Sequence, residues 1–326
     1  MIVNQCKKLY RLTKRMLIVV KSRRSICKPR PSSMAETKLI TDLRHKMNKL
    51  KSKNIIIENE WAGRLNQLRQ DFKSKDPRNF LNWDVVNQTM FHECREVELD
   101  YLKKLNDWPK WKEALQESSV GCPRRYSKLK SSSGNLIHSA YNLARFLSFN
   151  NLNITKLDVI FEFGGGYGSL CRLFYKLGFQ GKYIIYDLPE FSLLQEYFLK
   201  SLNMDLNVTK ENTSDYHKTV TLISDTSELA QHLPKKSLDM LIATWSLSES
   251  PISLRQNILK SVGNPNNYLI AYQEKFCNIN NEEYFSNLIH LYPNYTWQKY
   301  PIAHLPPSHY LFGKKNNDQN SPEALY

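Results

Sequence analysis

The residues of this chain best suited to chemistry are a group of glycines with acidic residues on both sides. Four of the eleven glycines stand within five consecutive residues. Gly164, Gly166 and Gly168 would keep side chains out of a tight turn between an apolar run and a helical pattern. Such a turn lets a ligand approach the backbone and presents free N–H groups at the helix start. Glu162 and Asp187 flank this turn, which predicts a ligand site containing two carboxylates.

The spacing of these residues distinguishes between nucleotide ligands. The pattern E-x-G-G-G-x-G over residues 162–168 lacks the third glycine of the dinucleotide fingerprint G-x-G-x-x-G. A nearby carboxylate disfavours a pyrophosphate, whereas a sulfonium ligand with an α-amino group carries positive charge that Glu162 would attract. Asp187 follows Gly168 by nineteen residues, near the offset at which an acid reaches a ribose diol. We therefore expect a cationic adenosine ligand and not NAD; the competing interpretation is a glycine turn and a surface aspartate without a ligand.

The elements that must position these residues alternate between short apolar runs and amphipathic helices. This alternation predicts an α/β fold with a mostly parallel sheet and helices on both faces. Two further strands separated by prolines predict an antiparallel hairpin at the C-terminal sheet edge. The expected strands are Leu157–Phe163, Tyr183–Tyr186, Val220–Ile223, Met240–Ala243, Leu269–Tyr272, Tyr295–Tyr300 and His309–Gly313, and the expected helices are 167–177, 190–202, 226–232 and 251–261.

The first half of the chain has a helical texture instead. Apolar residues recur at three- and four-residue spacing, which predicts helices over 35–72, 84–118 and 136–147, with turn-rich links at 121–126 and 131–135. We therefore divide the chain into four parts. These are a basic N-terminal arm (1–33), a helical N-terminal region (34–150), a ligand-binding α/β domain (151–315) and a polar tail (316–326).

Composition places the chain among globular proteins and locates its charge. The net charge is +15, but residues 1–30 hold ten Lys or Arg and no acidic residue, which leaves +5 for the remainder. The arm is open to four interpretations: a disordered basic tail, a membrane-surface anchor, a nucleic-acid contact, or a segment before a translation start at Met34. No apolar run approaches the eighteen residues of a membrane-spanning helix. The six cysteines include no C-x-x-C pair, so neither a metal site nor a redox pair is expected.

Two segments carry a resemblance to a known family. E-F-G-G-G-Y-G-S (162–169) and Y-D-L-P-E-F-S-L-L-Q-E-Y (186–197) resemble the class I S-adenosylmethionine (SAM)-dependent methyltransferases. Within them the chain is most similar to the sugar O-methyltransferase family of bacterial surface-polysaccharide loci. The resemblance covers roughly residues 120–313 and is strongest over 158–198. It implies a Rossmann-like doubly wound sheet and SAM as the cofactor. It also implies that the helical N-terminal region (34–150) caps the site.

The resemblance also implies roles for individual residues. The loop glycines would line the methionine and ribose parts of SAM, Glu162 would lie near the amino group, and Asp187 would hold the ribose hydroxyls. Leu188 would flank the adenine. The segment Thr244–Glu249, which contains Trp245, would face the methyl group. The glycines concerned are Gly164, Gly165, Gly166 and Gly168.

The catalytic base is open at this point. Plant-type relatives use a histidine near the position of Trp245, but this chain has no histidine between His232 and His290. A sugar hydroxyl needs a group that removes its proton. There are four candidates. Glu249 follows the fourth strand, and His138 lies on the helix before the first strand. His304 and His309 both precede the last strand. Glu249, His138 and His309 each have a competing structural interpretation.

The function that we expect is methyl transfer from SAM to a sugar hydroxyl of a glycan or its lipid- or nucleotide-linked precursor. A small-molecule or RNA methyltransferase is the alternative, and the non-enzymatic alternative is a SAM-fold structural partner. Most of the positive charge lies in the arm, which argues against nucleic acid as the acceptor. We expect a cytoplasmic location, with contact to the inner face of the membrane open through residues 1–33. The sequence leaves the oligomeric state undetermined.

Overall fold

The computed structural model describes residues 31–50, 59–90, 94–202, 204–234 and 238–316. Residues 1–30 of the predicted arm and 317–326 of the predicted tail lie outside these ranges, so both predictions stand untested. Within the described ranges, none of the helices combines the length and apolar character of a membrane span.

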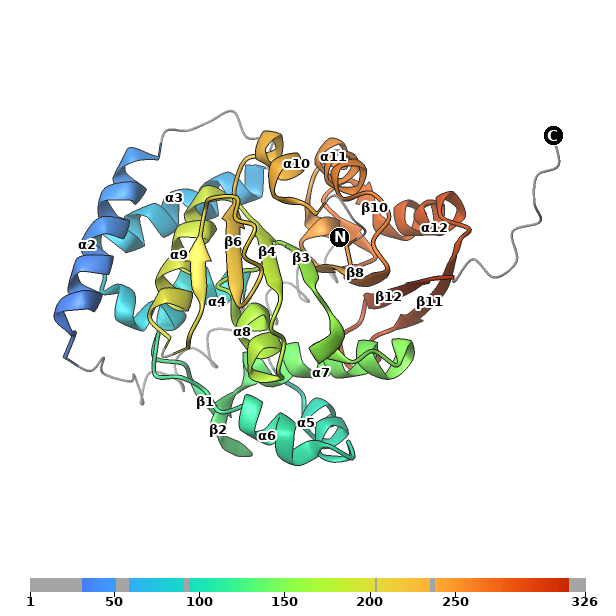
Figure 1. Cartoon of the computed structure of the whole chain (residues 1–326), viewed down its shortest axis with the longest axis horizontal. Coiled ribbons are helices and arrows are strands. Elements are labelled where there is room, and N and C mark those ends of the chain that lie inside the picture. Colours follow the sequence, from blue (N-terminus) through green and yellow to red (C-terminus); the bar gives the residue numbers. More distant parts are fainter. Residues whose placement is uncertain (1–30, 51–58, 91–93, 203, 235–237, 317–326) are drawn as a thin grey trace, which may run out of the picture.

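The described residues form an eight-stranded sheet in the order β11-β12-β8-β7-β3-β4-β6-β5 (Figure 1). β12 runs antiparallel to both β8 and β11, and the other pairs are parallel. The α/β fold, the parallel core and the C-terminal hairpin are therefore confirmed. The strands are β3 (Val159–Phe163), β4 (Lys182–Tyr186), β5 (Asn207–Thr209), β6 (Thr219–Ile223), β7 (Met240–Thr244), β8 (Asn267–Gln273), β11 (Tyr295–Pro301) and β12 (Ser308–Lys315).

The central strands are buried on both faces, as expected for parallel strands covered by helices. In β3, Ile160 belongs to one hydrophobic cluster, and its neighbour Phe161 belongs to another. Alternate side chains therefore enter two separate cores. The first core includes residues of α7 (Gly134–Asn150), α8 (Ser169–Lys176) and α9 (Pro189–Lys200). The second includes residues of α10 (Leu229–His232), α11 (Ile252–Val262) and α12 (Asn281–Leu291).

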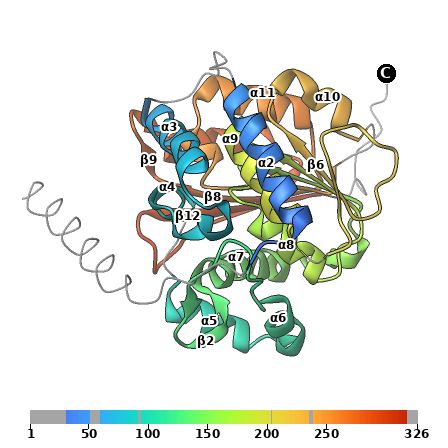
Figure 2. The ribbon, with the colours of Figure 1, turned by 90° about the vertical axis from the view of Figure 1, so that its left-hand side faces the viewer.

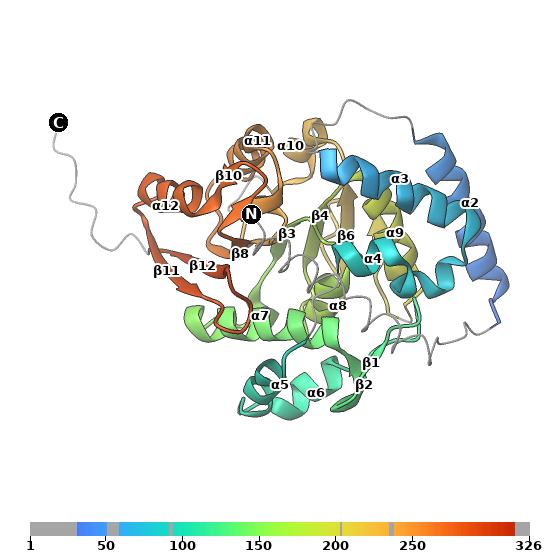
Figure 3. The ribbon, with the colours of Figure 1, turned by 180° about the vertical axis from the view of Figure 1, so that it is seen from behind.

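The N-terminal helices pack against the first core. α2 lies beside α9 (Figure 2), where Lys46 Nζ donates to Glu196 Oε1 at 2.7 Å and Tyr197 donates to Glu36 at 3.0 Å. α5 packs on α7 (Figure 3). These elements are α2 (Met34–Lys49), α3 (Asn59–Ser74), η2 (Pro77–Asn82), α4 (Asp84–Thr89), α5 (Glu96–Lys103) and α6 (Trp108–Ala114).

Several predictions for this region were wrong in detail. The helix expected over 84–118 is three short helices, because α4 ends at Thr89 and Pro109 starts a new helix, α6. The helix expected over 35–72 is two helices, on either side of the undescribed residues 51–58. The link expected at 131–135 is divided between two elements. Residues 131–133 belong to a hairpin of β1 (Arg125–Tyr126) with β2 (Leu129–Ser133), and Gly134 begins α7. Ser133 then caps α7 by accepting from Leu136 N at 3.1 Å.

The described residues also contain elements that the periodicity did not predict. These are β5, α12 and a short hairpin of β9 (Lys275–Phe276) with β10 (Ile279–Asn280). α12 begins at a capping residue, since Asn280 accepts from Glu283 N. α7 packs against α8 and β12, which lie beyond the expected boundary at residue 150. The division into an N-terminal region and an α/β domain remains a prediction.

Candidate functional site

A cavity of about 520 Å³ lies at the carboxyl ends of β3, β4 and β7. The chain enters the sheet at β3, proceeds to β4 and β6 on one side, and then crosses to β7 and β8 on the other. The strand order therefore reverses between β3 and β7, and open α/β sheets bind ligands outside the strands at such a switch point. The volume is in the range of small-molecule sites.

The glycine loop forms the floor of this cavity. Gly164 follows β3 with a φ of +77°, and an added Cβ would overlap the Cβ of Ser246. Gly166 has a φ of +59°, a conformation that glycine adopts without strain. The N–H of Gly164 donates to Tyr186 O at 2.8 Å, which anchors the loop to the end of β4. The lining residues include Gly164, Gly165, Gly166 and Glu162.

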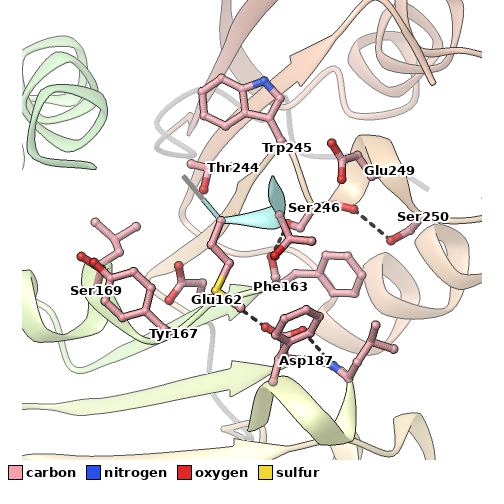
Figure 4. A pocket seen from close by; sticks show the side chains of 18 of the residues that line it. Glu162, Phe163, Tyr167, Ser169, Asp187, Thr244, Trp245, Ser246, Glu249 and Ser250 are labelled. Carbon is pink, nitrogen blue, oxygen red and sulfur yellow. Dashed lines mark hydrogen bonds between the residues drawn. The ribbon is translucent and has the colours of Figure 1, made fainter. Parts of the chain in front are cut away.

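Asp187 holds the loop from the end of β4 (Figure 4). Its Oδ2 accepts from Gly166 N at 3.1 Å and from Gln195 Nε2 at 2.8 Å, and its Oδ1 accepts from Leu188 N at 2.8 Å. Gln195 also donates to Gly166 O at 3.0 Å and so joins the carboxylate of Asp187 to the glycine loop. Gln195 was not among the residues predicted from the sequence. Its position two turns after Asp187, on the inner face of α9, is the signal that could have identified it.

Burial controls the charge of both carboxylates. Asp187 and Glu162 are almost fully buried. Burial raises the pKa of Glu162 to about 8, although a hydrogen bond from Tyr183 at 2.9 Å acts in the opposite direction. Burial likewise raises the pKa of Asp187 to about 7 against the hydrogen bonds that it accepts. The cavity therefore holds two acids that a cationic ligand would ionise.

The segment after β7 forms the opposite wall (Figure 4). Trp245 has a φ of +64°, which is strained for a bulky residue, and its backbone N–H donates to Ala271 O at 2.6 Å. Ser246 donates to the backbone oxygen of Phe163 and so joins this wall to the end of β3. Glu249 lines the cavity and accepts from Gln273 Nε2 at 3.4 Å.

Buried Arg255 holds the same wall from behind. Its guanidinium donates to Ser248 O at 2.7 Å and to Ser250 O at 2.8 Å. It also donates to Asn281 Oδ1 at 2.8 Å. These contacts fix the turn that carries Glu249.

His138 reaches the cavity from α7. Its Nδ1 lies 2.7 Å from Glu98 Oε1, and its ring centroid lies 5.4 Å from that of Trp245. The same oxygen of Glu98 lies 2.8 Å from His304 Nε2. Glu98 was not among the residues predicted from the sequence. A lone glutamate on a short helix carries no signal, because α5 meets α7 only in the folded chain.

Two predicted site residues lie apart from the others. The described lining of the cavity does not include Gly168 or His309. Gly168 is the N-cap of α8, with a φ of +92°. The ring of His309 packs on Tyr272 at 5.6 Å, and its Nδ1 lies 3.3 Å from Glu282 Oε1. The structure thus brings His138 and Glu249 to the cavity among the catalytic candidates. His304 contacts Glu98 and does not belong to the described lining, so roles for His304 and His309 stay predictions without support from their positions.

The N-terminal helices close the cavity. Trp61 and Arg64 of α3 line it together with Gln88, Thr89 and Met90 near α4. The guanidinium of Arg64 lies 5.1 Å from the centroid of the Trp61 ring. Leu188 and Trp245 also belong to the lining. Among the described residues, no group of three or more His, Cys, Asp or Glu side chains could hold a metal ion.

Known proteins resemble this chain in structure but not in sequence. No family model matches the chain, and no curated protein sequence matches it. An rRNA methylase from Streptococcus thermophilus aligns with 55% of this chain and 97% of its own, at 13% identity and a TM-score of 0.39. The magnesium protoporphyrin IX methyltransferase of Synechocystis PCC 6803, solved with bound SAH, aligns with 67% of this chain and 97% of its own, at 13% identity and a TM-score of 0.38.

A third solved structure is the glycopeptide N-methyltransferase MtfA in complex with sinefungin. It aligns with 55% of this chain and 87% of its own, at 10% identity and a TM-score of 0.39. The fold of the present chain is Rossmann-like by its own strand order. Its function has to be inferred from the cavity.

Proposed function

We propose that the cavity binds SAM and that the chain is a SAM-dependent methyltransferase. The observation that carries this proposal is the pair of buried carboxylates, Glu162 and Asp187, on either side of a glycine loop at the switch point of the sheet. A cationic ligand offsets the negative charge of two buried carboxylates, whereas these carboxylates would repel a pyrophosphate.

The residues present fit this cofactor. Asp187 accepts three hydrogen bonds from the protein, and a carboxylate has about four acceptor sites, so a hydroxyl can still donate to it. Glu162 would face the amino group, and Leu188 and Phe191 offer apolar surface for an adenine. Gly164 lets the loop pack directly against Ser246, where a side chain would overlap. When bound, SAM supplies an electrophilic methyl group on a sulfonium.

The protein's own contribution is to position and deprotonate the acceptor. Methyl transfer is an in-line displacement, so most of the catalysis comes from holding two partners in line. Trp245 and Glu249, on the segment after β7, line the cavity, and so does His138. The ring of His138 packs against Trp245. We propose His138 and Glu249 as the candidates for taking a proton from the hydroxyl.

We propose a sugar hydroxyl as the acceptor. The support is the mixture of polar and aromatic groups that closes the cavity: Trp61 offers a ring face, and Gln88, Thr89, Asn135 and Ser139 offer hydrogen-bonding groups. A hydroxyl-rich ring uses both kinds of contact. We also propose a glycan or its lipid- or nucleotide-linked precursor as the physiological form, acted on in the cytoplasm.

Calorimetric titration with SAM, S-adenosylhomocysteine (SAH) and NAD tests the cofactor. We expect micromolar-range binding of SAM and SAH and none of NAD; binding of NAD alone would overturn the proposal. Incubation with methyl-labelled SAM then tests the acceptor class. We expect labelled methyl groups to be transferred to components of a mixture of hexose-containing oligosaccharides and nucleotide-sugars. Transfer to total RNA instead would mean that the acceptor is a nucleic acid and not a sugar.

A further inference from the structure

The ring of His138 is held by the protein at both of its nitrogens. Nδ1 lies 2.7 Å from Oε1 of the buried Glu98, and Nε2 lies 3.3 Å from Asn142 Nδ2. The hydroxyl of Tyr310 donates to the amide oxygen of Asn142, so the amide presents its NH₂ group to the ring. His138 therefore supports the cavity wall beside Trp245, and neither ring nitrogen is left to take a proton from an acceptor.

The other groups in the described lining that could accept a proton are engaged or already protonated, apart from one carboxylate. Glu162 and Asp187 flank the glycine loop and belong to the cofactor site in the function proposed above. Burial raises the pKa of both Tyr167 and Tyr186, the latter to about 12, so both phenols stay protonated at neutral pH. The carboxylate that remains is Glu249, on the turn after β7.

The turn that carries Glu249 has a fixed backbone. The N–H of Glu249 donates to Trp245 O at 3.1 Å, and the guanidinium of buried Arg255 donates to two backbone oxygens of the same turn. In Figure 4, Glu249 and Trp245 lie on the side of the cavity opposite Asp187. The carboxylate is therefore held across the cavity from the proposed ribose site.

Gln273, at the end of β8, contacts the carboxylate itself. Its Nε2 donates to Glu249 Oε1 at 3.4 Å, and its Oε1 accepts from the hydroxyl of Ser248 at 2.9 Å. Its backbone oxygen accepts from Nδ2 of the buried Asn281 at 2.9 Å, which fixes the end of the strand. A donated hydrogen bond favours the ionised form of a carboxylate. A carboxylate has about four acceptor sites, so the bond from Gln273 leaves Glu249 able to accept a proton.

Resting on the methyl transfer proposed above, we propose that Glu249 is the general base for the acceptor hydroxyl and that Gln273 is its positioning residue. The acceptor oxygen bonds to the methyl carbon as the carbon–sulfur bond breaks and its electron pair stays on sulfur. The hydroxyl proton passes to the Glu249 carboxylate, and the glutamic acid so formed returns it to solvent after the products leave. His138 takes no part in the proton transfer.

The role of Gln273 can be tested without any acceptor. Carbon NMR of protein labelled with ¹³C at the glutamate side-chain carboxyls, and saturated with SAH, follows the titration of each acid, and Glu249→Gln identifies the signal. We expect Gln273→Leu to move the titration midpoint of Glu249 to higher pH, because a donor to the ionised form is lost. Gln298→Leu, an exposed glutamine on β11, is the matched control and should leave the midpoint in place. An unchanged midpoint in Gln273→Leu would overturn the positioning role.

Removal of the carboxylate separates proton transfer from cofactor binding. Glu249→Gln should slow the transfer of labelled methyl groups from SAM to the oligosaccharide and nucleotide-sugar mixture by about 10²- to 10⁴-fold, and Glu249→Asp should recover part of the loss. SAH affinity should stay within about twofold, because SAH carries no sulfonium charge for Glu249 to attract. Glu113→Gln makes the same chemical change on α6, at an exposed position outside the described lining, and should keep the full rate.

The pH profile of the transfer rate distinguishes the two candidate bases. The rate should fall as the pH is lowered, because a protonated base cannot accept the hydroxyl proton. This acidic limb should persist in a His138→Gln protein that still binds SAH, and it should vanish from the residual rate of Glu249→Gln. In the Glu249→Gln background, Gln273→Leu should have no further effect on the rate, since positioning requires the base.

The outcomes distinguish this inference from the proposed function. A full transfer rate in a folded Glu249→Gln protein, or loss of the acidic limb in His138→Gln alone, would overturn the role of Glu249 while methyl transfer stands. A wild type that binds neither SAM nor SAH would overturn the proposed function itself.

Discussion

Asp187 shows how burial and hydrogen bonding compete at one carboxylate. Burial raises its pKa to about 7, yet three N–H donors still hold it in place. The same three contacts tie together the glycine loop, the end of β4 and α9. A single side chain therefore connects the ligand site to the packing of the sheet.

Removing this carboxylate should weaken cofactor binding far more than it weakens the fold. We expect Asp187→Ala to reduce SAH affinity at least about 100-fold, because the proposed charge-assisted hydrogen bond to a ribose hydroxyl is lost and the loop loses an anchor. Calorimetric titration measures the change. Asp205→Ala, an exposed acid 3.8 Å from Lys218 Nζ, is the control. Unchanged affinity in a folded Asp187→Ala protein would contradict the placement of the cofactor.

The raised pKa values of the two acids predict a pH dependence of binding. In the free protein the pKa of Asp187 is about 7 and that of Glu162 about 8, so both are largely protonated at pH 6. A cationic ligand favours their ionised forms, so binding should release protons and affinity should rise between pH 6 and 8. Calorimetric titrations with SAM at pH 6.5, in buffers of different ionisation enthalpy, measure the number of protons released. A binding enthalpy independent of the buffer would refute this account, and Glu162→Gln should reduce the release.

At the scale of elements, the unit β3–loop–α8 depends on close backbone approach. Gly164 combines a positive φ with a position where a Cβ would overlap Ser246, on the segment after β7. The floor and the wall of the cavity therefore meet at this glycine.

A methyl group at this position should disturb both stability and binding. We expect Gly164→Ala to lower the free energy of unfolding by about 1–3 kcal/mol and to weaken SAH binding. Gly63→Ala is the matched control, because Gly63 lies within α3 and an added Cβ meets nothing within 4 Å. That change should stabilise by up to about 1 kcal/mol. Equal effects of the two substitutions in thermal unfolding would show that the contact with Ser246 is unimportant.

At the scale of the whole molecule, charge and site are separated along the chain. The arm carries ten of the basic residues, whereas the cavity is built from residues 61–276. Ser33 accepts from Glu36 N at 3.1 Å and caps α2, so a cut after residue 30 preserves the start of that helix.

Deletion of residues 1–30 should therefore leave SAH affinity within about twofold of the full chain, and calorimetry on both proteins tests this. Deletion through residue 50 also removes α2, which packs on α9, and should lower the melting temperature. A large loss of affinity in the shorter deletion would mean that the arm belongs to the cofactor site.

The sequence by itself determined the sheet-bearing half of this protein. Most strand and helix positions after residue 150 follow from local periodicity, although β5, α12 and the β9–β10 hairpin do not. The glycine loop with its two acids follows from local spacing. These features are short-range, since each apolar run or glycine cluster specifies its own backbone. The ends of the N-terminal helices were harder to predict from the sequence, because they depend on capping residues and prolines more than on apolar spacing.

Only the tertiary structure decided which side chains meet at the cavity wall. Glu98, His138 and His304 come from three elements, up to 206 positions apart, and nothing in the local pattern links them. The same holds for Gln195, whose side chain donates hydrogen bonds to both Asp187 and Gly166. Burial decided the charge of each acid as well, because a pKa depends on solvent access and partners that exist only once the chain has folded.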